Sequence, residues 1–189
     1  MDHPKEQGTE STASGGRLQR LGRRAVRELP WLLILLAIYW AVSSSQTVEI
    51  EMGERPPPIR APLIGGGGGV DTAELRGKPL VLVFWAPWCR VCSVEMPLLG
   101  ELQQSFGERA SVLGVGLSGS RAEMDEFAAK HGSGFPQVYG DQRISSAYGI
   151  RAFPTILILD SEGRVQHQFV GLTTRWRLQW SVSRLVDEG

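Results

Sequence analysis

The residues best suited to chemistry are Cys89 and Cys92, the two cysteines of the 189-residue chain. A disulfide between cysteines so close in sequence removes little conformational entropy from the unfolded chain, so the pair is a poor structural cross-link. A thiolate is the attacking species in disulfide exchange, and it is stabilised at the start of a helix and beside a cation such as Arg90. We therefore predict that Cys89 attacks a partner and that Cys92, one helical turn later, resolves the mixed disulfide.

A metal site is the alternative use of the same two sulfurs. Two thiolates can hold Cu(I), and Met96 is placed to add a thioether. Zinc is a poorer fit, because a structural zinc site needs four ligands and the histidines, His3, His131 and His167, have no paired spacing. His131 is expected at a helix C-terminus and His167 on a strand face, neither of them catalytic. Disulfide exchange needs no cofactor or metal, and copper binding stays open.

The residues on either side of the pair predict the strand and the helix that position it. Leu80–Trp85 is a continuous apolar run, typical of a central strand covered on both faces. Beyond the cysteines, apolar residues recur at helical spacing over 94–106 and Gly107 then ends the helix. Pro97 is expected to bend this helix or to lie in its first turns. Cys89 thus falls where a buried strand ends and a helix begins.

The remainder of the C-terminal part alternates between strand and helix. Strands are expected at residues 111–117, 155–159 and 164–170, the last two joined as a hairpin by a turn at 160–163. Helices are expected at 124–131, between an N-cap at Asp141 and a C-cap at Gly149, and at 174–186. This order indicates an α/β fold with a mixed central sheet flanked by helices, and it resembles the thioredoxin fold.

The N-terminal part predicts a single transmembrane helix outside that fold. Residues 1–28 read as a disordered tail that ends in an arginine-rich stretch, and 29–48 contains no charged side chain. As a helix, 29–48 is about 30 Å long, the thickness of a bilayer core. The arginines should stay in the cytoplasm, which places the C-terminal domain in the periplasm. The alternative is a cleaved secretory signal, with a small-residue site at 41–43.

Residues 49–70 predict a tether between this anchor and a domain at 71–189. Prolines at 56–58 stiffen such a segment, and glycines at 65–69 loosen it. The glycine run is not expected to bind phosphate, because Lys78 is followed by Pro79 and no Gly-Lys-Ser/Thr follows the glycines. Lys and Arg balance Asp and Glu at 20 each, which makes nucleic acid an improbable partner.

Several motifs resemble those of known redox proteins. The run FWAPWCRVC at 84–92 resembles the active site of thioredoxin-like proteins. Glu95, Pro97 and the stretch at 74–79 are similar to the membrane-anchored TlpA-like branch, which includes the thioredoxins of cytochrome c maturation. The Arg-Val dipeptide between the cysteines and the stretch at 171–176 resemble the suppressor-of-copper-sensitivity disulfide oxidoreductases. The loop at 149–155 aligns with the loop whose proline, here Pro154, is cis in this family and packs against the cysteine pair.

The resemblance also implies roles for residues around the cysteines. Thioredoxin has a buried aspartate as proton acceptor where this chain has Val83, so Glu95 is expected to handle the proton of Cys92. The alternative for Glu95 is a carboxylate in the first helical turn that favours the helix dipole. Trp88 is expected to line the surface where a partner docks. Phe153 and Pro154 are expected to offer a backbone edge to a partner's extended segment.

These observations lead to one principal functional expectation. The chain is expected to exchange disulfides with protein thiols or with another redox protein, as a single-pass protein of the inner membrane with its domain in the periplasm. A copper-binding or copper-delivery module that uses Cys89 and Cys92 is the alternative, and a redox-inert docking domain is a third. The direction of electron flow is left open, because it depends on a reduction potential.

Overall fold

The computed structural model describes residues 30–31, 33–39, 50–131 and 134–187, in two units, Met1–Ser45 and Gln46–Gly189. In the first unit, residues 30–31 and 33–39 are helical. Within the described ranges, no helix is long and apolar enough to cross a membrane. The predicted tail at 1–28 and part of the predicted span at 29–48 lie outside the described residues.

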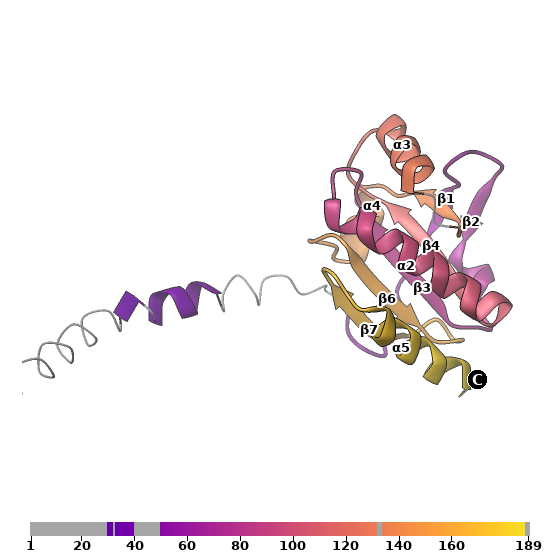
Figure 1. Ribbon diagram of the computed structural model, residues 1–189. Coiled ribbons are helices and arrows are strands. Elements are labelled where there is room, and N and C mark those ends of the chain that lie inside the picture. Colours follow the sequence, from indigo (N-terminus) through magenta and orange to yellow (C-terminus); the bar gives the residue numbers. More distant parts are fainter. Residues whose placement is uncertain (1–29, 32, 40–49, 132–133, 188–189) are drawn as a thin grey trace, which may run out of the picture. The chain divides into compact units, whose positions relative to one another are not determined.

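The second unit is built on a five-stranded mixed sheet (Figure 1). Its strands are β3 (Leu80–Trp85), β4 (Ser111–Gly116), β5 (Gln137–Tyr139), β6 (Thr155–Leu159) and β7 (Val165–Val170). Their order is β5-β4-β3-β6-β7, with β3, β4 and β5 parallel and β6 antiparallel to both β3 and β7. All six residues of β3 are buried, as its unbroken apolar run predicted.

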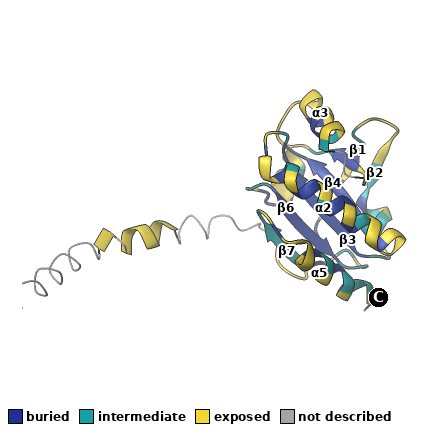
Figure 2. Ribbon diagram, viewed as in Figure 1, coloured by how far each residue is buried: buried dark blue, intermediate teal, exposed yellow. Residues whose placement is uncertain are grey.

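Helices cover both faces of this sheet. They are α2 (Arg90–Phe106), α3 (Arg121–His131), α4 (Gln142–Ala147) and α5 (Arg175–Asp187). Side chains of α2, α3 and α5 share one core cluster with one face of the sheet, whereas Ile144 of α4, the residues that follow α4 and apolar residues within 50–63 pack against the other face. Figure 2 shows β3, β4 and β6 largely buried, β7 largely intermediate, and the helices α2, α3 and α5 with both exposed and buried residues. This is the mixed sheet flanked by helices that the sequence predicted.

The boundary predicted at residue 71 is wrong, because the chain enters the fold at Ile50. Ile50, Ile59 and Ala61 are buried in the second core cluster. Gly53 N donates to Val165 O at 2.7 Å, and Val165 N donates back to Glu54 O at 2.9 Å. Isolated apolar residues among prolines and glycines give no periodic signal, so only their burial against the sheet reveals them.

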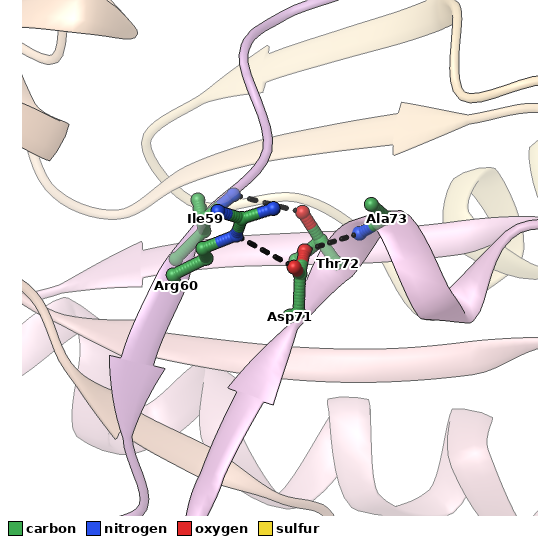
Figure 3. Close-up of polar contacts among 5 residues, drawn as sticks. All are labelled: Ile59, Arg60, Asp71, Thr72 and Ala73. Carbon is green, nitrogen blue, oxygen red and sulfur yellow. Dashed lines mark hydrogen bonds and ion pairs between the residues drawn. The ribbon is translucent and has the colours of Figure 1, made fainter.

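The second half of the predicted tether is a small hairpin with polar contacts at its base. β1 (Arg60–Pro62) pairs antiparallel with β2 (Gly69–Asp71), and the glycine run forms the connection between them. Asp71 accepts from Arg60 Nε at 2.7 Å and from Ala73 N at 2.9 Å, while Ile59 N donates to Thr72 Oγ1 at 2.9 Å (Figure 3). A short helix, η1 (Thr72–Leu75), follows with Asp71 as its N-cap.

Smaller differences concern short or terminal elements. β5 was not predicted, because three residues carry no usable pattern and their pairing with β4 depends on the assembled sheet. Asp141 caps α4 as expected, but the C-cap is Tyr148, one residue before Gly149. Pro97 lies inside α2, which continues to Phe106 and is capped by Gly107; a second short helix, η2 (Gly107–Arg109), follows directly.

Candidate active site

The two cysteines sit where β3 leads into α2. Cys89 is the N-cap residue of α2, and its Sγ is bonded to Sγ of Cys92 in a disulfide. Cys92 N donates to Cys89 Sγ at 3.1 Å. This amide is one of those at the helix start that lack an acceptor within the helix, and it points at the sulfur of Cys89. Cys89 is 6% exposed and Cys92 1%. A partner therefore meets Cys89 first, and the helix N-terminus favours its thiolate.

Backbone contacts fix the loop that carries Cys89. Cys89 N donates to Ala86 O at 3.0 Å, and Leu117 N donates to Trp85 O at 2.7 Å. The loop after β4 lies against Pro87, since a Cβ on Gly119 would come within 2.6 Å of Pro87 Cγ. Gly119 also has a φ of +150°, so a side chain there is disfavoured twice. The sequence offered no signal for this contact.

A second loop brings an aromatic side chain to the first. The Phe153–Pro154 peptide bond is cis, as the resemblance implied. The ring of Phe153 meets that of Trp88 edge-on, with centroids 5.5 Å apart, and Trp88 is 66% exposed. Gly171 N donates to Pro154 O at 2.8 Å, which ties the loop to the end of β7. Trp88 and Phe153 thus form an aromatic pair that joins the cysteine loop to the proline loop.

Glu95 is the acid of this site. It lies three residues after Cys92 on α2, so both side chains share one face of the helix, and each is 1% exposed. Its Oε1 accepts from Thr173 N at 2.9 Å, and its Oε2 has no partner among the described residues. Burial raises the pKa of Glu95 to about 7, although the hydrogen bond from Thr173 lowers it.

The first-turn alternative for Glu95 is wrong. The first turn of α2 contains no acidic residue, and Glu95 is directed into the core rather than toward solvent at the helix start. Val83, at the position of the thioredoxin aspartate, is buried in β3. Among the described residues Glu95 is the one buried acid. The sequence did not predict the hydrogen bond from Thr173 N to Glu95, because no local pattern indicates a backbone amide that lies 78 residues away.

Among the described residues, His, Cys, Asp and Glu side chains do not gather into a metal site. In the part of the chain that the structure describes, no group of three or more His, Cys, Asp or Glu residues could hold a metal ion. Met96 is buried in the same core cluster as both cysteines. His131 ends α3 with its ring 4.6 Å from that of Phe127, and His167 lies on β7 beside Phe169.

Comparisons with known proteins agree with this geometry. The model of the AhpC/TSA family matches residues 52–168. The chain is 28% identical to the thioredoxin-like protein YneN of Bacillus subtilis over 156 residues, covering 78% of this chain and 91% of that protein. It is 30% identical to the thiol-disulfide oxidoreductase ResA of Geobacillus kaustophilus over 160 residues, covering 81% and 91%.

A solved structure supports the fold. A putative thiol:disulfide interchange protein DsbE from Chlorobium tepidum superposes with a TM-score of 0.69 at 22% identity, over 73% of this chain and 99% of that one. A family match over most of the folded domain and a cysteine pair at the start of a helix lead to one conclusion: this chain belongs to the AhpC/TSA family and is one of its thioredoxin-like thiol–disulfide oxidoreductases.

Proposed function

We propose that this oxidoreductase exchanges disulfides with protein thiols in the periplasm, with Cys89 as the attacking and Cys92 as the resolving cysteine. The observation that carries the assignment is the position of Cys89 at the N-cap of α2, where it is the more exposed sulfur of the pair. A membrane or periplasmic redox protein is the expected partner for the return of electrons.

The exchange balances without a cofactor. A partner thiolate attacks Cys89 Sγ, the Cys89–Cys92 bond breaks, and Cys92 leaves as a thiolate that takes up a proton. A second thiol of the partner then gives up its proton and attacks the mixed disulfide, which releases the Cys89 thiolate. The partner has lost two electrons and the enzyme has gained them; the reverse sequence reduces the partner.

Glu95 is the proposed proton carrier for Cys92. An acid with a pKa of about 7 is half-protonated near neutral pH, so it can give a proton to a leaving thiolate or take one from a thiol. Cys92 has almost no solvent contact, which makes direct exchange of its proton with water slow. A neighbouring carboxyl group on the same helical face supplies the proton from within the core.

Trp88 and Phe153 are the proposed partner-binding residues. Their edge-on contact places an exposed aromatic surface directly before Cys89. The backbone at Phe153 and Pro154 precedes β6, so a partner's extended segment can pair there and hold its sulfur in line with Cys89. Apolar side chains next to the partner's cysteine would suit this surface.

Attachment to the inner membrane is proposed from the uncharged run at 29–48 and the arginines before it. We expect the intact chain to be released from cells only by detergent. A membrane-impermeant maleimide should label its reduced cysteines in intact cells. A soluble product that starts near Ser44, or cysteines labelled only after lysis, would contradict this arrangement.

An insulin-reduction assay tests the exchange activity against the copper alternative. The full chain in detergent should reduce insulin with dithiothreitol as electron donor, and Cys89→Ser should not. Cu(I) titration against a chromophoric chelator is run on the same samples. Stoichiometric Cu(I) uptake by a chain that has no insulin turnover would replace the proposed function with copper binding by Cys89 and Cys92.

A further inference from the structure

Apolar side chains extend outward from the cysteine pair along two helices. Val91 and Val94 of α2 are 41% and 61% exposed, and Leu172 and Trp176, before and in α5, are 65% and 69% exposed. Leu98 of α2 is half-buried on the same side. Large apolar side chains in such numbers are rarely left to solvent without a partner. We call Val91, Val94, Leu98, Leu172 and Trp176 the α2–α5 surface.

Two polar contacts make these residues one surface. Val91, Val94 and Leu98 follow one another at the spacing of a single helical face. Thr173 N donates to Glu95, so Leu172 is held beside the start of α2. Arg175 at the start of α5 forms an ion pair of 2.5 Å with Glu101 of α2. Figure 1 shows α2 and α5 side by side on the same face of the sheet.

The charge around this surface is positive. Arg90, next to Cys89, is exposed, and the negative charge of Glu101 is already met by Arg175. Arg177 lies over the ring of Phe169 of β7, with its guanidinium 4.9 Å from the centroid, so it points away from α2 and is not part of this surface. A complementary occupant therefore carries apolar side chains and acidic ones.

We propose that the α2–α5 surface docks a protein partner whose cysteine is accompanied by apolar and acidic residues; this rests on the proposed function. The surface begins beside Cys89, whose sulfur is almost covered and can react only with a partner in close contact. A lipid surface on this face would block that approach. Docking here extends the contact well beyond Trp88 and Phe153 and selects partners by charge.

The test uses the reduced full chain in neutral nanodiscs and three disulfides. Two are disulfide-linked peptide dimers with identical apolar flanks and either acidic or basic residues around the cysteine; the third is uncharged 2-hydroxyethyl disulfide. Oxidation of the chain is followed by acid quenching, alkylation and intact mass. The acidic peptide should react about tenfold faster than the basic one, which corresponds to about 1.4 kcal/mol.

Substitutions locate the preference. Val94→Gln combined with Trp176→Gln should slow the acidic peptide about tenfold, as the loss of an anchor residue does. The same variant should react with hydroxyethyl disulfide within about twofold of wild type. Arg90→Glu should reverse the preference between the peptides. Met52→Gln, which changes an apolar residue 59% exposed beside the start of β7, is the matched control and should change no rate.

Several outcomes would overturn the proposal. Equal rates for the two peptides would contradict the docking surface but leave the exchange activity. So would a double variant whose rate with hydroxyethyl disulfide falls as much as its rate with the acidic peptide. Slower peptide reaction in anionic nanodiscs, relieved by the double variant, would assign the surface to lipid. A dimer in sedimentation that the double variant dissociates would assign it to a second copy. A wild-type chain inert toward all three disulfides removes the proposed function and the surface together.

Discussion

Replacing Cys89 with alanine lowers the rate of disulfide exchange by at least about 10³-fold, because no other residue can form the mixed disulfide. Cys92 is 1% exposed and cannot replace it. The Cys92→Ala variant should behave differently, since its Cys89 still attacks but the bond to the partner is never resolved. Intact mass after incubation with a disulfide-linked peptide measures this difference: Cys92→Ala gains the mass of one peptide and Cys89→Ala gains none.

Exposure and the hydrogen bond from Cys92 N to Cys89 Sγ are the reasons for this asymmetry. Ser93→Ala, which changes the residue directly after Cys92 in α2, is a suitable control because it keeps both cysteines. A peptide adduct that accumulates on Cys89→Ala and not on Cys92→Ala would reverse the assigned roles.

The second large effect is a pH dependence of stability that comes from Glu95. Its pKa is raised from 4.5 to about 7 in the folded protein, chiefly by burial. Between these two values the folded state holds the proton more tightly than the unfolded chain does. The free energy of unfolding therefore falls as pH rises through this window, is highest below pH 4.5 and levels off above about 7. At 1.36 kcal/mol per pKa unit the loss is about 3 kcal/mol.

Glu95→Gln removes this titration and keeps an oxygen that can accept from Thr173 N. Above pH 7 the variant should be more stable than wild type by up to about 3 kcal/mol, and near pH 4.5 the two should be similar. Urea unfolding of the disulfide-bonded forms at pH 4.5 and pH 8 gives the comparison. Glu126→Gln, an exposed acid on α3, should keep the wild-type pH dependence. A Glu95→Gln variant with that same dependence would show that Glu95 is not its source.

The same variant tests the proton role of Glu95 in exchange. If Glu95 carries the proton of Cys92, Glu95→Gln slows exchange about tenfold or more and removes the inflection near pH 7 from the rate profile. A structural role alone leaves that profile unchanged. An unaltered exchange rate together with an unaltered titration of Cys92 would therefore remove the catalytic role, while the stability effect described above could remain.

Local sequence patterns predicted most of the elements around the cysteines. Leu80–Trp85 is unmistakable because a parallel strand covered on both faces must be apolar at every position. Gly107 ends α2 and Asp141 begins α4 through cap chemistry that involves only neighbouring residues. In the N-terminal segment the same approach failed, since Ile50 and Ile59 are single apolar residues whose burial depends on a sheet formed far along the chain.

The sequence by itself determined that this protein carries a thiol pair at the start of a helix, because two cysteines at this spacing follow a buried strand. It also pointed to Pro154 through resemblance. Only the tertiary structure decided how that chemistry is tuned. The burial of Glu95 under Thr173 and the meeting of Trp88 with Phe153 join residues far apart in sequence. Desolvation, which raises the pKa of Glu95, is a property of the packed core, and no local pattern encodes it.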